Sequence, residues 1–595
     1  MLRDIRKNKF FNRRALIIGS IQAFMAGALI SRLAYLQLFK NKEYTIQSDS
    51  NRIKTMMMPA PRGNIYDRNN MLLTQNNDSY RLLFYNDKKR NVEQISKDLF
   101  DILDLQDQQK ARILRKFSQI GNKSVISLID NLGWYEMARI ESNSHKLPSI
   151  SIESGTIRQY KYPFSLAHIL GYVSLPSQKE VEQSKQALYM HPDFRLGKLG
   201  IEKLHDEYLR GKYGLKYVEV NSKDIPIKTI KQDLPQQGQD VNLTIDINLQ
   251  NYVHDLIKDL VASVIVLDVT NGEILSCNST PTFNTNNFVE GVSYDYWQAI
   301  SNNNLNPLNN RPISAIYPPG STFKIIVALA ALESGYNFKK KHICRGHNKY
   351  GNRIFNCWKE EGHGALNLSD AIKNSCNIYF YEIANEIGYD AIYNMAKKFG
   401  YGVKTGVDLI GEISPILPNE EWKRAKFKSK WVGGDTLNAS IGQGYILATP
   451  MQIAIANSAI ANGGRLFRPY FVKKRLSAFY GRFVDIKEQH IDFVKKAMYK
   501  VVNEKGGTAY YQRLKDKDFK VSGKTGTSQV ISKRGNDKLE DKFQNHAIFT
   551  GFAPSHNPKY SISVIVENGG GGSSVAAPIA MKVMNFINLY IYNKS

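Results

Sequence analysis

The spacing of hydrophobic and polar residues changes several times along the chain, and the first distinct pattern is a long apolar run. Residues 15–38 are mostly apolar, with basic residues before them and Arg32 near their far end. A helix of this length can cross a bilayer, and a long basic side chain near its end can reach the interface. The pattern predicts a membrane-spanning helix over 15–38, preceded by a short tail, 1–14.

The basic residues in this tail predict the orientation of the anchor. Positive charge flanking a span stays in the cytoplasm, so the tail is expected inside and the rest of the chain outside. A cleaved signal peptide is the competing interpretation. The tripeptide Ala26-Gly27-Ala28 resembles a cleavage site, but it lies within the apolar run and not after it. We therefore predict an uncleaved, single-pass anchor.

Residues 50–240 mix two kinds of pattern. Alternating polar and apolar residues after the segment 59–68 predict strands joined by a turn, whereas Ile95, Leu99 and Ile102 follow helical spacing. The second pattern predicts a helical insert over about 92–140. These residues contain no obvious catalytic constellation, so we interpret 50–240 as a non-catalytic structural module.

From residue 243 to 595 the patterns predict one further domain. The pattern predicts an amphipathic helix over 249–257 and a hairpin over 262–277. It also predicts two late strands before a final helix, at 546–552 and 560–566. A helical block separates the early strands from the late ones. This order predicts an antiparallel sheet flanked by helices, with a site between the sheet and a helical lobe. The whole chain is thus a multidomain α+β protein.

Size and charge narrow the classes of function. The 595 residues have room for three or four domains, and 42% hydrophobic content is ordinary for a folded protein. The 80 basic and 54 acidic residues give a net charge of +26. Lysine is spread along the chain and no nucleic-acid motif is present, so we exclude nucleic acid as a partner. With only four cysteines, the chain is not a disulfide scaffold.

A candidate nucleophile lies in residues 317–324, YPPGSTFK, at the start of an apolar run that predicts a buried helix closing at Gly335. Ser321 and Lys324 are three residues apart, which places them on one helical face. The serine N–H would lie in the first turn, where unpaired amides favour an anion. The motif offers a nucleophile, a base and half of an oxyanion hole.

Two downstream motifs make this signal more specific. Ser375-Cys376-Asn377 follows a predicted helix, and residues 524–527, KTGT, follow a segment suited to a strand lining a cleft. The ordered set of three motifs resembles the active site of serine penicillin-recognising enzymes. With the segment 62–68, RGNIYDR, it is similar to class B penicillin-binding proteins, and the resemblance covers the chain from the anchor to the last helix.

This resemblance implies roles for five residues. Ser321 would be the nucleophile, and Lys324 its base, provided that burial and the nearby cation Lys524 lower the lysine pKa. Ser375 and Asn377 would pass a proton to the leaving group and orient the substrate amide.

Three further residues would form the substrate-binding edge. Thr525 and Thr527 suit a substrate carboxylate, and Gly526 lets a peptide lie close to the strand. The N–H groups of Ser321 and Thr527 would form the oxyanion hole, a contribution commonly worth about 3–4 kcal/mol per donor.

The resemblance also implies the reaction and its setting. The family cross-links peptidoglycan stem peptides ending in D-alanyl-D-alanine, is acylated by β-lactams, and requires no cofactor for the chemistry. A pedestal of the dimerisation type, 50–240, would hold a serine β-lactamase-like transpeptidase domain, 243–595, in the periplasm of a bacterium with its anchor in the inner membrane.

Several stretches resemble the elongation-specific branch that maintains rod shape, among them 357–359, CWK, and 441–445, IGQGY. Asn377 departs from it, since many of its members carry Asp there. Implied partners are a polytopic glycan-polymerising glycosyltransferase and a rod-shape scaffold that binds the pedestal. Three alternatives remain open, namely a division-specific transpeptidase, a D,D-carboxypeptidase and a membrane-bound β-lactam sensor.

Four residues near the second motif form a candidate metal set. Some members of this branch hold a structural zinc with two Asp, a His and the Cys of the second motif. His363 and Cys376 match two of those ligands, and Cys344 and Cys357 appear in place of the acids, which gives a Cys₃His set that zinc accepts. The alternative is a Cys344–Cys357 disulfide with His363 packed against Trp358. Cys277 is expected in the core of its strand.

Overall fold

The computed structural model describes residues 2–41, 52–85, 91–118, 120–121, 125–147, 149–184, 187–191, 194–220, 226–473, 481–529 and 544–594. Residues 50 and 51, where the pedestal was predicted to begin, lie outside this set. The chain divides into two compact units. The first consists of Met1–Ala60, Tyr80–Glu153 and Lys212–Gln237, and the second of Pro61–Ser79, Ser154–Gly211 and Gly238–Ser595.

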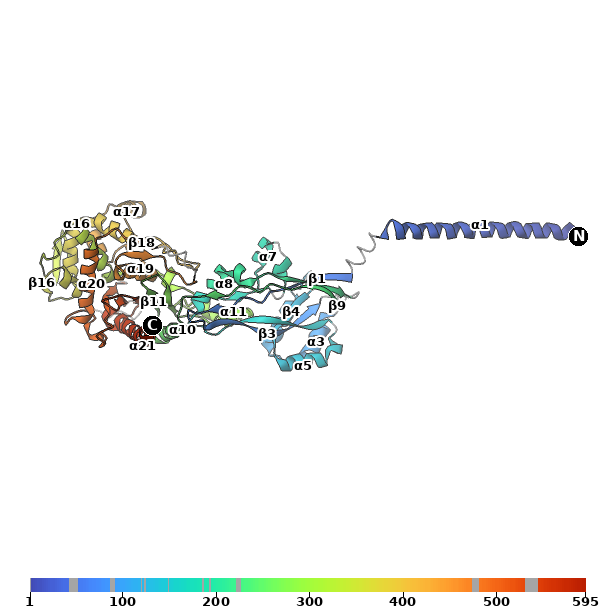
Figure 1. Cartoon of the computed structure of the whole chain (residues 1–595), viewed down its shortest axis with the longest axis horizontal. Helices are drawn as coiled ribbons and strands as arrows, with labels where there is room; N and C mark the ends of the chain where they lie inside the picture. Colours follow the sequence, from blue (N-terminus) through green and yellow to red (C-terminus); the bar gives the residue numbers. More distant parts are fainter. Residues whose placement is uncertain are drawn as a thin grey trace. The chain divides into compact units, whose positions relative to one another are not determined.

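The first unit begins with one continuous helix, α1, Leu2–Leu38 (Figure 1). Its part Arg13–Leu38, 26 residues, is long and apolar enough to cross a membrane, and none of it is buried within the protein. The helix runs without a break because the segment contains no proline. The predicted helix is therefore confirmed, and it extends through the basic tail.

The rest of the first unit consists of two sheets with helices. Strand β1, Ile53–Met58, pairs antiparallel with β8, Gly214–Val220, which pairs with β9, Pro226–Asp233. The end of β3, Leu72–Tyr85, pairs with β4, Val125–Leu132. The helical elements are α3, Val92–Ile102; α4, Asp107–Ser118; α5, Trp134–Ser142; and the 3₁₀ turn η1, Ser144–Lys146.

The predicted helical insert over about 92–140 is wrong in one part. Residues 125–132, VISLIDNL, form β4 and not a helix. β-Branched residues favour a pleated surface, and the available edge of β3 supplies the partner that local helical spacing cannot reveal. The helices α3 and α4 bury Leu99 and Phe117 in one core with Leu82 and Leu128 of the two strands.

The second unit contains a set of short elements from the region predicted as pedestal. Strand β5, Ile150–Tyr160, begins in the first unit, continues into the second from Ser154 and pairs with β3. The other elements are β2, Ile65–Tyr66; β6, Val173–Ser174; β7, Leu196–Gly197; β10, Val241–Asn242; α6, Ala167–Leu170; α7, Gln178–Ser184; η2, Ala187–Met190; α8, Gly200–Leu204; and α9, Asp206–Arg210.

A buried charge network holds these short elements together. The carboxylate of Glu202 is fully buried and accepts from Arg62 Nε at 2.6 Å and Arg158 Nε at 2.8 Å. Asp206 lies 2.9 Å from a second nitrogen of Arg62. Burial by itself raises the pKa of the Glu202 carboxyl, but the two guanidinium groups outweigh burial and hold that pKa below its usual range.

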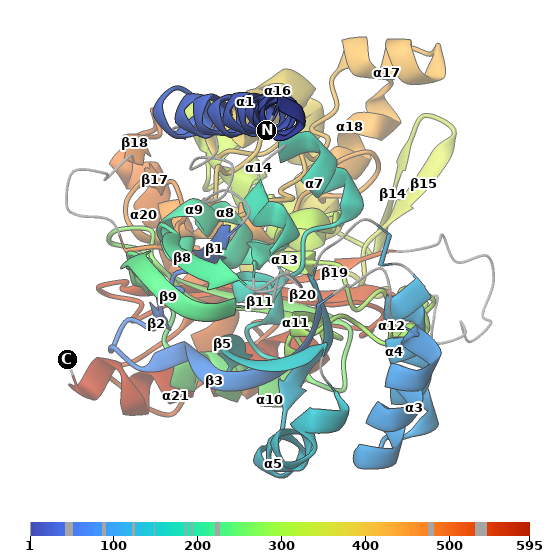
Figure 2. The same ribbon diagram turned by 90° about the vertical axis from the view of Figure 1, so that its right-hand side faces the viewer.

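The main sheet of the second unit has five antiparallel strands in the order β12-β11-β21-β20-β19. Its strands are β11, Ala262–Asp268; β12, Ile274–Thr280; β19, Ser522–Ser528; β20, His546–Ala553; and β21, Tyr560–Val566. Among them, Figure 2 labels β11, β19 and β20. The predicted hairpin and late strands are confirmed, and the chain's third motif lies on the edge strand β19.

Helices cover both faces of this sheet. Neighbouring residues Val264 and Ile265 of β11 belong to different core clusters, as expected for side chains that point to opposite faces of a strand. The first face packs against α10, Ile247–Ile257, and α21, Ala577–Tyr590. The second packs against α19, Pro450–Ala461, which is buried along its whole length.

A helical lobe completes the unit. Helix α14, Lys324–Glu333, packs against α16, Asn377–Lys398, which also contacts α18, Gly433–Ser440. The remaining elements are α11, Asn286–Val289; α12, Tyr294–Ser301; α13, Arg311–Ser314; η3, Gly320–Thr322; β13, His342–Cys344; β14, His347–Tyr350; β15, Arg353–Asn356; β16, Gly364–Leu366; α15, Leu368–Lys373; α17, Glu420–Phe427; β17, Arg465–Phe467; β18, Gly481–Phe483; α20, Glu488–Asn503; η5, Tyr510–Gln512; the π-helical turn η7, Gly572–Ala576; and η8, Tyr592–Lys594.

Candidate active site

The candidate nucleophile lies in a tight turn that precedes α14. Ser321 is the middle residue of η3 and is half-buried. Gly320 has a φ of 54°, and its N–H donates to the carbonyl of Gly442 at 2.9 Å. A Cβ on Gly320 would lie 2.7 Å from the carbonyl oxygen of Thr527. Only glycine adopts this conformation readily at so close an approach, so Gly320 allows the serine turn to lie directly against β19.

Lys324 is the first residue of α14, and its side chain is fully buried. Its Nζ donates to Asn377 Oδ1 at 2.7 Å and to the Ser375 carbonyl at 2.9 Å, and it lies 3.4 Å from Ser375 Oγ. Within the described residues, no hydrogen bond joins it to Ser321 Oγ. The oxygens of the second motif satisfy this buried amine, and the Ser321–Lys324 pair stays a prediction. Such catalytic pairs are often loose without substrate.

Lys524 of β19 approaches the second motif from the sheet. This side chain is also fully buried, and its Nζ donates to Ser375 Oγ at 2.8 Å and to the carbonyl of Thr525 at 3.0 Å. The hydroxyl of Ser375 therefore lies between two amines, one from the helical lobe and one from the sheet. The structure brings together the three motifs that lie far apart in the sequence.

Burial determines the electrostatics of these two lysines. It lowers the pKa of Lys324 from 10.5 to about 8, although the nearby thiols of Cys376, Cys357 and Cys344 act in the opposite direction. It lowers the pKa of Lys524 well below its usual value, and the positive charge of Lys324 lowers it further. Both effects disfavour the charged ammonium. The site can therefore offer a neutral amine near neutral pH.

The second motif has a constrained backbone. Ser375 lies between α15 and α16 with a φ of 54°, in the left-handed region that costs a residue with a side chain about 1–2 kcal/mol. This conformation directs its hydroxyl toward the two lysines. Asn377 begins α16, and its Nδ2 donates to the carbonyl of Asn356 at 3.2 Å.

The threonines of β19 lie in different surroundings. Thr525 is buried, and its Oγ1 lies 2.7 Å from that of Thr508. Thr527 is half-buried, and its backbone lies beside Gly320, so the N–H groups of Ser321 and Thr527 belong to adjacent segments. Sequence reasoning missed Thr508, which follows Gly506 and Gly507. Two adjacent glycines are typical of a turn, and nothing in the local sequence connects Thr508 with β19.

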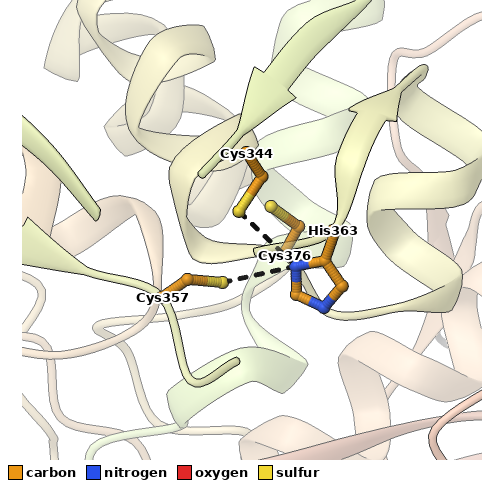
Figure 3. A group of neighbouring side chains, drawn as sticks. All are labelled: Cys344, Cys357, His363 and Cys376. Atoms are coloured by element: carbon orange, nitrogen blue, oxygen red, sulfur yellow. Dashed lines mark hydrogen bonds between the residues drawn. The ribbon is translucent and has the colours of Figure 1, made fainter. Parts of the chain in front are cut away.

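The side chains of the four candidate metal ligands converge on one point, as Figure 3 shows for Cys344, Cys357, His363 and Cys376. Their ligand atoms all lie within 4.8 Å of one another. The Nδ1 atom of His363 is 3.6 Å from Cys344 Sγ and 3.5 Å from Cys357 Sγ. All four cysteines of the chain are free thiols, so the alternative Cys344–Cys357 disulfide is not present. Cys277 lies buried in β12, as predicted.

Sequence reasoning also missed how Trp358 and Asn356 contact the second motif. The Nε1 atom of Trp358 donates to the carbonyls of Asn374 and Ser375, at 3.0 and 3.1 Å. The string CWK indicated a family branch but no contact, because the indole reaches this motif only after the chain has folded back.

The site combines a serine at a helix start, two buried amines and a strand edge beside the serine. Together these features define an active-site-serine acyltransferase of the penicillin-recognising class. Two family models match the chain. The penicillin-binding protein transpeptidase domain matches residues 262–585, and the penicillin-binding protein dimerisation domain matches residues 57–243. The chain belongs to the penicillin-binding proteins, in the branch whose curated members are called peptidoglycan D,D-transpeptidase MrdA.

Three similar proteins illustrate this membership. The MrdA proteins of Haemophilus influenzae and Escherichia coli are 34% and 33% identical to the chain, and the matches cover 98% and 96% of the chain and 92% and 93% of the relatives. A solved complex of a penicillin-binding protein, PBP2, with MreC from Helicobacter pylori has a TM-score of 0.81 at 30% identity. That match covers 91% of this chain and 99% of the solved one.

Proposed function

We propose that this chain is a peptidoglycan D,D-transpeptidase that forms an acyl-enzyme on Ser321. The observation that carries the proposal is the environment of Lys324. Its buried amine has three uncharged oxygens as acceptors and a pKa lowered to about 8. A lysine in this state can take a proton, as the base of a serine nucleophile must. The names of the similar proteins supply the substrate class.

The first half of the reaction uses the three motifs together. Neutral Lys324 takes the proton of Ser321, and Oγ attacks the carbonyl carbon of the D-alanyl-D-alanine bond. The N–H groups of Ser321 and Thr527 stabilise the oxyanion of the tetrahedral intermediate. Ser375 then passes a proton to the departing amine, so the C–N bond breaks, free D-alanine leaves and the stem peptide remains as an ester of Ser321.

The second half regenerates the serine. An amine of a neighbouring stem peptide attacks the ester carbonyl and loses its proton through the same groups, and the C–O bond to Ser321 breaks. The product is a peptide cross-link between two stems. Lys524 and the threonines of β19 suit the terminal carboxylate of the donor, because they present an amine and two hydroxyls as hydrogen-bond donors beside the serine turn.

The cellular setting is also part of this proposal. We infer that α1 anchors the chain in the bacterial inner membrane, with the amino terminus in the cytoplasm and the catalytic domain in the periplasm. The basic residues before the span support this orientation. We also propose domain boundaries near residues 38, 50, 240 and 243, and a role in cell-wall elongation. The solved PBP2–MreC complex supports a scaffold protein as partner, and a glycan polymerase is the second partner proposed.

We further propose a structural zinc held by Cys344, Cys357, His363 and Cys376. Zinc bonds of about 2.3 Å to sulfur and about 2.0–2.1 Å to nitrogen, arranged as a tetrahedron, place the ligand atoms about 3.6–3.8 Å apart. The two sulfur-to-Nδ1 distances of 3.5 and 3.6 Å fit that arrangement. When bound, zinc would fix the loop that carries the second motif, and it takes no part in the acyl transfer.

The test of the transpeptidase proposal is covalent labelling of the full chain in detergent with benzylpenicillin, followed by intact mass. We expect one stable penicilloyl adduct on the wild type and none on Ser321→Ala. Consumption of the drug without an adduct would mean that the chain is a β-lactamase, and the proposal would be rejected.

The zinc proposal has its own readout in metal content. We expect about one zinc per purified chain, lost in Cys344→Ala and retained in the control Cys277→Ala, which removes a buried thiol outside the cluster. Equal zinc in both variants, or none in the wild type, would reject the site.

A further inference from the structure

Three consecutive residues hold the second motif of the active site. Asn356 accepts at its carbonyl from Asn377 Nδ2 at 3.2 Å, and Cys357 Sγ accepts from the Asn377 N–H at 3.4 Å. Trp358 donates from Nε1 to the carbonyls of Asn374 and Ser375. Residues 356–358 therefore contact the motif on both sides of Cys376, at its first residue and at its last.

Trp358 differs from a core tryptophan, because the residue is 58% exposed while the single polar atom of its side chain points inward. An exposed ring gains little from burial, so packing does not explain the placement of this side chain. The ring contacts His363 at a centroid distance of 5.2 Å, with the two ring planes at 64° to each other. The indole N–H is the part of the side chain that reaches the catalytic motif.

The carbonyl that Trp358 binds is the one that holds the catalytic base. The oxygen of Ser375 accepts from Trp358 Nε1 at 3.1 Å and from Lys324 Nζ at 2.9 Å. The same residue has a positive φ, so its peptide groups need outside contacts to keep their orientation. A rotation of this peptide would move Ser375 Oγ away from Lys324 and Lys524 together.

We propose that Trp358 is a positioning residue for acyl transfer, which holds the Ser375 peptide through its indole N–H and thereby aligns Lys324 and Ser375 Oγ. Trp358 acts on the reaction through Ser375 and has no chemical step of its own. This inference rests on the proposed transpeptidase function, because it concerns the speed of the acylation that the function requires.

The test is stopped-flow acylation of the full chain in detergent by a fluorescent penicillin. The variants are Trp358→Phe, which keeps a flat ring but loses the N–H, and Trp358→Leu, which loses both. The matched control is Trp134→Phe, an equally conservative change at a 73% exposed tryptophan in the other unit. The experiment separates the acylation rate constant, the dissociation constant of the initial complex and the fraction of active enzyme.

We expect Trp358→Phe to lower the acylation rate constant about tenfold, because it removes the partly buried hydrogen bond to the Ser375 carbonyl. Trp358→Leu should lower it at least as much. The dissociation constant and the active fraction should stay as in the wild type, and Trp134→Phe should match the wild type throughout. An unchanged rate constant in Trp358→Phe would overturn the inference. So would a reduced active fraction at an unchanged rate constant, since that is the effect of a purely structural residue. A wild type that forms no adduct would instead refute the transpeptidase function, and this inference with it.

Discussion

Two buried groups of cations in the same unit are held in opposite ways. Arg62 and Arg158 surround one carboxylate, that of Glu202, at 2.6 and 2.8 Å. Lys324 and Lys524 share the hydroxyl of Ser375, and the acceptors around them are uncharged oxygens. The first group is neutralised by an acid, whereas the second can become neutral only by releasing protons.

The difference follows from the chemistry of the two side chains. A guanidinium remains protonated in proteins, so a buried arginine requires an anion or pays a large desolvation cost. An amine can lose its proton when burial disfavours the charge. The arginines therefore suit a structural junction, and the lysines suit proton transfer.

The largest effect is expected from Lys324→Met, which keeps the length of the side chain but removes the base. We expect the penicillin acylation rate to fall by about 10²–10⁴-fold, the usual contribution of a general base. Circular dichroism should show a folded protein, because the substitution removes a buried group that prefers to be uncharged. The comparison of the two buried groups would be contradicted if Lys324→Met destabilised the protein while its remaining folded molecules reacted with penicillin at the wild-type rate.

The next effect is expected from Glu202→Gln, which leaves two buried guanidinium groups without their anion. We expect the free energy of unfolding of the second unit to fall by about 3–5 kcal/mol, measured by urea denaturation of the full chain. The acylation rate per active molecule should not change. If the rate fell and the stability did not, the arginine group would have a catalytic and not a structural role.

A third effect concerns pH. Lys324 must be neutral to accept a proton, so a pKa of about 8 predicts that acylation rises about tenfold from pH 7 to pH 9 and then levels off. Because the folded pKa is lowered from 10.5, the folded state binds fewer protons than the unfolded state between these values, and the stability contribution of Lys324 rises with pH there. A rate that is flat over this range would exclude Lys324 as the titrating base.

The smallest effect is expected from Glu420→Gln, the matched control for Glu202→Gln. Glu420 pairs with Arg424 one turn later in α17, and both side chains are more than half exposed. Removing such a pair should change the free energy of unfolding by about 0.3 kcal/mol. A loss comparable to that of Glu202→Gln would show that burial is not what separates the two ion pairs.

The sequence by itself determined the features that depend on local patterns. The apolar run 15–38, the hairpin of β11 and β12 and the late strands were predicted because their periodicity belongs to single elements. The order of the three motifs around Ser321, Ser375 and Lys524 indicated the family, since their chemistry depends on residue types more than on coordinates. These features do not require knowledge of distant contacts.

Only the tertiary structure decided the remainder, because these features arise between segments that are distant in the chain. Local spacing could not show that residues 125–132 form a strand, since their partner is β3. It could not show that the Lys324 amine donates to Asn377 and to the Ser375 carbonyl, which lie more than 50 residues away in the sequence. Four Cys and His side chains converge, and Trp358 contacts Ser375, because the chain folds back so that β13 and β15 both contact α16.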